Sequence, residues 1–128
     1  MSKLNHVVES QQFDEHILEM IFSIADTMQV NPTAYQTPGK ILATVFYEPS
    51  TRTRLSFESA MLQLGGRVIS TENAKEFSSF SKGESLEDSI KTISGYADII
   101  ALRHFEIGSA KRAATVSNVP IINAGDGA

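Results

Sequence analysis

The run of residues 41–47 constrains the fold of this chain more than any other feature. It reads Ile-Leu-Ala-Thr-Val-Phe-Tyr and is nearly continuous in apolar and β-branched residues. Alternating polar and apolar residues mark a strand with one face in water, whereas an unbroken run is typical of a strand buried on both faces. Such a strand needs cover above and below it, so the run favours a parallel sheet between layers of helices.

The rest of the chain alternates between helical and extended patterns. Behind a loose arm of about seven residues, an amphipathic helix is expected from Ser10, its N-cap. Further helices are expected at 51–64, 85–97 and 108–117, strands at 67–70, 99–102 and 119–123, and an exposed loop at 71–84. This order predicts an α/β fold, a parallel sheet of about four strands with helices on both faces.

Two of these helices carry more detailed expectations. In the helix at 51–64, the residues available to the core are Leu55, Ala60, Met61 and Leu64. The helix at 85–97 opens with a capping serine and an acidic residue three positions later, Ser85 and Asp88.

In parallel sheets ligands bind outside the carboxyl ends of the strands. Chemistry is therefore expected just after Tyr47, Ser70, Arg103 and Asn123.

Composition excludes several functional classes of protein. The 128 residues are enough for one domain, and a net charge of -4 argues against a general nucleic-acid-binding protein. The absence of cysteine excludes disulfides, zinc–thiolate sites and thiol nucleophiles. No apolar run approaches the roughly 20 residues of a membrane helix. The polar start lacks a secretory pattern, so we expect a cytoplasmic protein with no membrane partner.

The strongest candidate site is the run Ser50-Thr51-Arg52-Thr53-Arg54, which follows the first strand and opens the next helix. Three hydroxyls, two guanidinium groups and the free N–H groups of a helix start suit a phosphate or a carboxylate. An ordinary helix cap followed by solvated arginines would have the same composition. The position at the carboxyl end of a buried strand favours the anion site.

Two further candidates are weaker. The polar loop 78–85 contains Lys82 beside a glycine, a pairing that could swing a cation over a ligand, although surface loops often have this composition. Arg103-His104 follows the third strand, where an arginine could clamp an oxyanion or simply lie in solvent. We expect His104 to be a packing or solvent-facing residue rather than a catalytic one.

No metal or cofactor is expected. No set of histidine and acidic residues has metal-ligand spacing, and His6 and His16 look structural. The glycine-rich approach and the Gly-Lys-Ser/Thr ending of a P-loop are absent, as is the G-x-G-x-x-G motif of dinucleotide folds.

The run of residues 46–58, Phe-Tyr-Glu-Pro-Ser-Thr-Arg-Thr-Arg-Leu-Ser-Phe-Glu, resembles the carbamoyl-phosphate signature of the aspartate and ornithine carbamoyltransferases. The Lys-Gly-Glu-Ser loop at 82–85 is similar to the mobile loop of the aspartate enzymes, and residues 103–104 and 123–127 also match the family. Glu48, where ornithine enzymes typically have lysine, favours the aspartate branch. The resemblance covers essentially the whole chain and less than half of the usual length of the family.

The resemblance implies a set of residues that bind carbamoyl phosphate: Ser50, Thr51, Arg52, Thr53, Ser78, Lys82 and Arg103. Arg52 would stabilise the departing phosphate, and Thr53 and Arg103 would polarise the carbamoyl carbonyl. Ser78 and Lys82 would reach the site of a neighbouring subunit in a homotrimer. The catalytic members would be Arg52, Thr53, Arg103 and Lys82.

The family continues with a His-Pro-Thr-Gln segment and an amino-acid-binding domain that are not found in these 128 residues. We therefore expect residues 1–128 to be an incomplete carbamoyl-phosphate-binding domain that binds the phosphate end and does not turn over alone. The implied partners of the full-length enzyme are L-aspartate and, in addition, a regulatory chain. Two alternatives stay open: a non-catalytic binding or assembly module of the same ancestry, and a fragment of an ornithine carbamoyltransferase.

Overall fold

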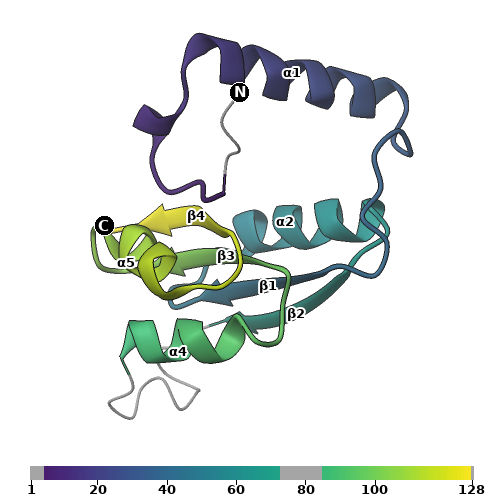
Figure 1. Cartoon of the computed structure of the whole chain (residues 1–128). Helices are drawn as coiled ribbons and strands as arrows, with labels where there is room; N and C mark the ends of the chain where they lie inside the picture. Colours follow the sequence, from purple (N-terminus) through teal and green to yellow (C-terminus); the bar gives the residue numbers. More distant parts are fainter. Residues whose placement is uncertain (1–4, 73–84, 128) are drawn as a thin grey trace.

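The computed structural model describes residues 5–72 and 85–127, and it has an α/β fold (Figure 1). Its single sheet has four parallel strands in the order β2-β1-β3-β4. The strands are β1 (Ile41–Phe46), β2 (Arg67–Glu72), β3 (Ile99–His104) and β4 (Ile121–Asp126). The helices are η1 (Ser10–Gln12), α1 (Glu15–Val30), α2 (Thr51–Gln63), α4 (Leu86–Ile93) and α5 (Ser109–Val116). The predicted parallel sheet is confirmed.

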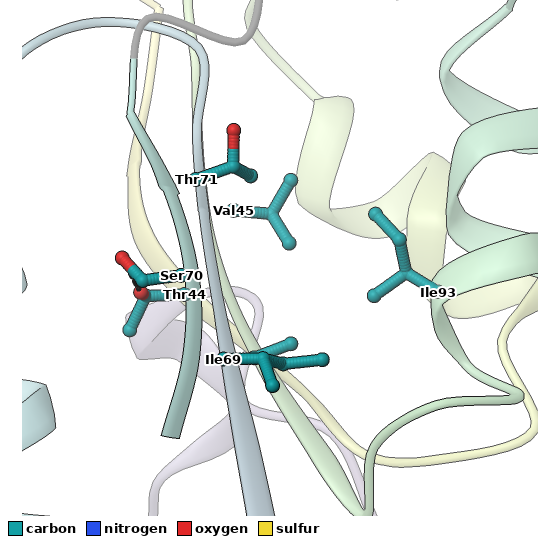
Figure 2. A pocket seen from close by; sticks show the side chains of 7 residues that line it. Thr44, Val45, Ile69, Ser70, Thr71 and Ile93 are labelled. Atoms are coloured by element: carbon teal, nitrogen blue, oxygen red, sulfur yellow. Dashed lines mark hydrogen bonds between the residues drawn. The ribbon is translucent and has the colours of Figure 1, made fainter. Parts of the chain in front are cut away.

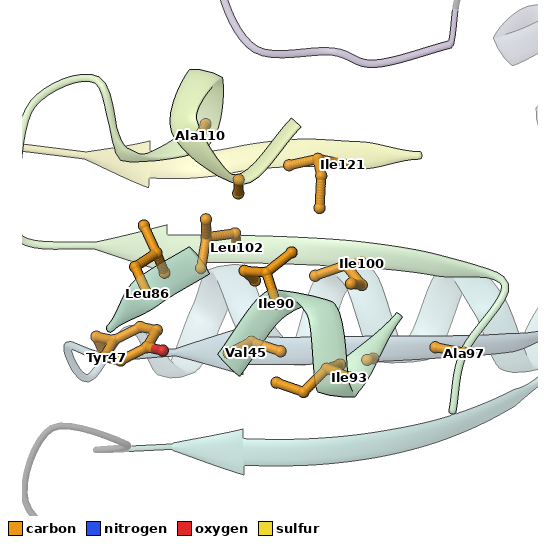
Figure 3. Packing of buried hydrophobic residues seen from close by; sticks show 12 residues of the cluster. Val45, Tyr47, Leu86, Ile90, Ile93, Ala97, Ile100, Leu102, Ala110 and Ile121 are labelled. Carbon is orange, nitrogen blue, oxygen red and sulfur yellow. The ribbon is translucent and has the colours of Figure 1, made fainter. Parts of the chain in front are cut away.

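Helices cover both faces of the sheet, as the unbroken apolar run at 41–47 predicts (Figure 1). Successive side chains of a strand point to opposite faces, so β1 contributes to two separate clusters. Ala43 and Val45 pack with α4 and α5, and Figure 3 shows how Ile90 of α4 lies over this part of the sheet. On the other face, Leu42 packs with Met61 of α2. The two clusters fix the helices against the sheet.

The register brings the carboxyl ends of all four strands to one edge of the sheet. Thr44 of β1 stands opposite Ser70 of β2 and Ala101 of β3. Beyond the end of β1, the N–H of Tyr47 donates to the carbonyl of Arg103 at 2.8 Å, which ties the ends of β1 and β3 together. The segments that follow these strands therefore meet at this edge, where ligands of parallel sheets bind.

The first long helix begins later than predicted. Ser10 opens the short 3-10 turn η1, and the N-cap of α1 is Asp14, whose carboxylate accepts a hydrogen bond from the N–H of Ile17 at 2.8 Å. The side chain of Gln12 explains the interruption, because it binds the carbonyl of His6 and accepts from two backbone N–H groups of the preceding segment. None of the residues of α1 is buried, and the helix lies apart from the sheet in Figure 1.

The prediction of a loose N-terminal arm is wrong for residues 6–8, which lie along β4. The N–H of Val7 donates to the carbonyl of Ile121 at 2.8 Å, and the N–H of Asn123 donates to the carbonyl of Val7 at 2.7 Å. The imidazole of His6 accepts from the N–H of Ile121, which confirms a structural role for this histidine. The segment thus forms a parallel bridge along the outer edge of β4.

Element boundaries differ from the predictions at several other points. β2 extends beyond the predicted 67–70 to Glu72, β4 is shifted from 119–123 to Ile121–Asp126, and α4 ends at Ile93 rather than at 97. The cap of α4 is confirmed, because the hydroxyl of Ser85 accepts from the N–H of Asp88 at 3.1 Å. In α2 only Met61 is buried, and Leu55 is 51 % exposed, so the predicted core face of this helix is too wide. Most of the expected loop at 71–84 lies outside the described residues.

Candidate functional site

The first turn of α2 lies directly after the carboxyl end of β1, and several of its polar groups make no hydrogen bond within the described residues. The helix begins with the N–H of Arg54 donating to the carbonyl of Ser50 at 2.9 Å. The N–H groups of residues 51–53 precede this bond and so have no acceptor within the helix. Ser50 occupies the N-cap position, yet its side chain makes no capping hydrogen bond. Because the usual cap is not made, the hydroxyl and the N–H groups are available to an anion.

The two arginines of this turn have different surroundings. Arg54 donates to Ser70 at 3.0 Å and forms ion pairs with Glu58 at 3.2 Å and Glu72 at 3.1 Å. The side chain of Arg52 is exposed and makes no hydrogen bond or ion pair within residues 5–72 and 85–127. Residues two positions apart on a helix, such as Arg52 and Arg54, do not lie on the same face. Of the pair, Arg52 is therefore the cation left for a ligand.

Arg103 of β3 supplies a second cation at the same edge. Its Nη1 donates to the carbonyl of Ala124 at 2.9 Å, and its buried Nε meets no acceptor among the described residues. The guanidinium lies against the backbone of β4 at Gly125, whose φ is +131°. A Cβ atom at this position would lie 2.4 Å from Nη1, so the lack of a side chain at Gly125 makes room for Arg103.

His104 is a buried packing residue, as the sequence predicts. Its ring stacks on Phe105 with centroids 4.1 Å apart and meets the edge of Tyr47 at 4.5 Å. Its Nδ1 accepts a hydrogen bond from the N–H of Glu106 at 3.0 Å. This group of rings packs at the carboxyl ends of β1 and β3.

A hollow of about 290 Å³ lies on the sheet between β1, β2 and α4 (Figure 2). Its lining includes Val45, Ile69, Thr71 and Ile93, and none of its lining residues is charged. A phosphate needs cations or several N–H donors, and this hollow offers neither. This hollow is therefore a poorer candidate for an anion site than the first turn of α2.

The remaining predicted site residues cannot be placed with the others. Ser78 and Lys82 lie outside the described residues. No three acidic or histidine side chains in the described ranges come together as metal ligands. None of the helices described is long and apolar enough to cross a membrane.

Glu58 belongs to a polar cluster to which the sequence interpretation gave no role. Its Oε2 accepts from the hydroxyls of Thr44 and Ser70, each at 2.8 Å, as well as from Arg54. Burial is the largest influence and acts to raise the pKa of Glu58. The hydrogen bonds from Ser70 and Thr44 and the charge of Arg54 outweigh it, so the pKa lies below the ordinary value. The i,i+4 spacing of Arg54 and Glu58 is the signal that could have found this pair.

Comparison with known proteins identifies the class. Residues 5–128 match the family model described as the carbamoyl-P binding domain of aspartate/ornithine carbamoyltransferase. The chain therefore belongs to the aspartate/ornithine carbamoyltransferase family.

Within the family, the chain is similar to proteins named for aspartate. It is 59% identical to aspartate carbamoyltransferase 2, chloroplastic, of Pisum sativum, over 98% of this chain and 34% of that protein. It is 56% identical to the aspartate carbamoyltransferase catalytic subunit of Clostridium novyi, over 95% of this chain and 40% of that protein. It thus spans between a third and two-fifths of the length of these two relatives.

Solved structures agree with this placement. The catalytic subunit of M. jannaschii aspartate transcarbamoylase superposes with a TM-score of 0.89 at 51% identity, covering 98% of this chain and 42% of that one. The aspartate transcarbamoylase of Trypanosoma cruzi, solved in complex with carbamoyl phosphate, gives a TM-score of 0.88 at 33% identity. That match covers 96% of this chain and 39% of the other.

Proposed function

We propose that this chain binds carbamoyl phosphate as part of an aspartate carbamoyltransferase. The whole protein would transfer the carbamoyl group to L-aspartate and release N-carbamoyl-L-aspartate and phosphate, a step of pyrimidine biosynthesis. The observation that carries the proposal is the uncommitted first turn of α2, with Arg52 exposed beside it, in a domain of this family. The names of the relatives at 56–59% identity support aspartate rather than ornithine as the acceptor.

The phosphate group would lie at the N-terminus of α2. Ser50, Thr51 and Thr53 would donate hydroxyl and N–H hydrogen bonds to its oxygens, and Arg52 would supply a charge-assisted pair. The helix adds about half a positive charge at this end. Because these donors sit on a helix held against the sheet, they are in place before the ligand arrives.

The transfer reaction would need stabilisation of charge rather than a covalent nucleophile. The amine of L-aspartate attacks the carbonyl carbon, and a C–N bond forms as negative charge builds on the carbonyl oxygen. Thr53 and Arg103 would bind that oxygen. The C–O bond to phosphate then breaks, phosphate leaves with the bonding electrons beside Arg52, and the nitrogen releases a proton. Loss of one such preorganised donor typically costs about 10²–10³ in rate.

Further binding groups and partners would lie beyond this site. Ser78 and Lys82 would reach the site of a neighbouring subunit in a homotrimer, and a regulatory chain would be a further partner. The amino-acid substrate would bind outside residues 1–128. A cytoplasmic location stays a prediction, and it needs a fractionation experiment because the Pisum sativum relative is named chloroplastic.

The test is a calorimetric titration of fresh carbamoyl phosphate into the purified chain. Arg52→Ala should weaken binding roughly 10- to 100-fold, the equivalent of one charged hydrogen-bonded contact of about 1.5–3 kcal/mol. Arg67→Ala is the matched control, because Arg67 is also exposed but begins β2 at the opposite edge of the sheet. Equal affinity of the wild type and Arg52→Ala would refute the role of Arg52.

A second assay separates the enzyme from a non-catalytic module of the same ancestry. Formation of N-carbamoyl-L-aspartate from carbamoyl phosphate and L-aspartate would be measured with the 128-residue chain alone. We expect no turnover alone, and turnover when the amino-acid domain of a relative is supplied. Turnover by the 128 residues alone would reject the module.

A further inference from the structure

One oxygen atom joins three elements just behind the candidate anion site. Oε2 of Glu58, on α2, accepts hydrogen bonds from Thr44 on β1 and Ser70 on β2, each at 2.8 Å. The two hydroxyls stand opposite each other in the register and are 2.9 Å apart. Figure 2 shows both side chains pointing away from Ile93, toward the face of the sheet that α2 covers. Glu58 therefore fastens α2 to the two strands at once.

Glu58 also holds the second arginine of the first turn. Nη1 of Arg54 lies 3.2 Å from the Glu58 carboxylate and 3.0 Å from the Ser70 hydroxyl, while Nη2 reaches Glu72 at the end of β2. A guanidinium donates in a planar fork, so contacts on both nitrogens fix its orientation. Arg54 also donates the first N–H of the helical ladder, to Ser50. The rotation of the first turn about the helix axis is thereby set from Glu58.

We propose that Glu58 is a positioning residue for the anion site, which it orients through Arg54 without touching the ligand. By holding Arg54 against the sheet, the carboxylate leaves Arg52 and the N–H groups of residues 51–53 directed at the ligand. The inference rests on the proposed function, since it names what prepares that same site. It also explains why the two arginines of one motif differ so much in their contacts.

The role needs a carboxylate. An ionised carboxylate only accepts hydrogen bonds, and here both hydroxyls and Arg54 donate to it. A glutamine in place of Glu58 would have the same shape but would present an NH₂ donor as well as one oxygen, and it would carry no charge for Arg54. The arginine would then be held by Glu72 and Ser70 alone. A first turn that is less well fixed should bind an anion more weakly, because small misplacements of positioned groups are costly.

The test compares Glu58→Gln with Glu19→Gln, the same change on an exposed position of α1. Inorganic phosphate is titrated into the ¹⁵N-labelled 128-residue chain, and the amide shifts of residues 51–53 report its affinity. Glu58→Gln should weaken phosphate binding about 10-fold, by analogy with the supporting partners of metal ligands. Ser70→Ala, which removes one donor to the same oxygen, should act in the same direction with a smaller effect. Glu19→Gln should match the wild type.

A second readout separates positioning from general stability. Amide exchange of Arg54 and Leu55 should accelerate in Glu58→Gln, while that of Leu64 at the far end of α2 should not. Equal phosphate affinity of Glu58→Gln and wild type would overturn the positioning role, even with lowered stability. Failure of the wild type itself to bind phosphate would overturn the proposed function, and the positioning role with it.

Discussion

Replacement of Gly125 by alanine tests whether the backbone of β4 sets the position of Arg103. Gly125 has a φ of +131°, a conformation that residues with a Cβ rarely adopt. The added Cβ would lie 2.4 Å from Nη1 and 3.0 Å from Cζ of Arg103. Ordinary van der Waals contact begins at 3.4 Å, so the guanidinium would have to move by about 1 Å. The hydrogen bond from Nη1 to Ala124 would be lost or lengthened.

Two costs add up in this variant. A non-glycine residue in a sparsely populated backbone region costs about 1–3 kcal/mol. The hydrogen bond from Arg103 contributes about 0.5–1.5 kcal/mol more. We therefore expect Gly125→Ala to lower the free energy of unfolding by about 2–4 kcal/mol and, because Arg103 moves, to weaken carbamoyl phosphate binding about 10-fold.

The assay is urea denaturation followed by circular dichroism, together with calorimetric titration of carbamoyl phosphate. Gly39→Ala is the matched control: its φ is +76°, but no atom lies within 4 Å of the added Cβ, and it precedes the amino end of β1. Gly39→Ala should cost roughly 1 kcal/mol and leave binding unchanged. If both variants lose the same stability and both bind as the wild type does, the contact between Gly125 and Arg103 plays no part in positioning.

Three further predictions concern stability. Ile90→Ala removes a fully buried side chain and should cost about 2–5 kcal/mol in urea denaturation, whereas Ile107→Ala, at a position 86 % exposed, should cost less than about 0.5 kcal/mol. Folding lowers the pKa of Glu58, so the stabilisation from its carboxylate is present above the ordinary pKa of about 4.3 and is lost as the pH falls through the lower folded value. The difference in the free energy of unfolding between the wild type and Glu58→Gln should therefore shrink from pH 7 to pH 3. Glu87→Gln breaks the ion pair with Arg112, whose side chains are both well exposed, and should cost less than about 1 kcal/mol, a loss that 1 M salt abolishes.

The strands could be predicted well because their burial leaves a direct trace in the sequence. A strand covered on both faces must be apolar throughout, and β1 differs from the expected 41–47 only at its last residue. The cap of α4 could also be predicted, since Ser85 and Asp88 are local partners. Prediction failed where tertiary contacts determine which residues are buried. Periodicity cannot tell which apolar residues of α2 are covered, so the sequence predicts Leu55 as a core residue although it is half exposed.

The place of residues 50–54 in the fold could be predicted, but the contacts that each arginine makes could not. The position of residues 50–54 after a buried strand follows from topology alone. Which arginine is free depends on whether a side chain from another strand comes within reach, and Ser70 and Glu72 reach only Arg54. The fit between Arg103 and Gly125 likewise joins residues that the sequence places 22 positions apart. Such contacts depend on the register of the sheet, which the sequence pattern does not specify.

The bridge between residues 6–8 and β4 has a consequence for how the chain avoids self-association. A bare outer strand offers unpaired N–H and carbonyl groups to any other extended chain. Along β4, Val7 and His6 already use the N–H groups of Ile121 and Asn123 and the carbonyl of Ile121. A variant without its first seven residues would keep the residues of its core but present an open strand edge, which is a template for intermolecular sheets. Aggregation of this variant in solution, followed by light scattering and thioflavin fluorescence, should therefore be faster than that of the intact chain, although no core residue has changed.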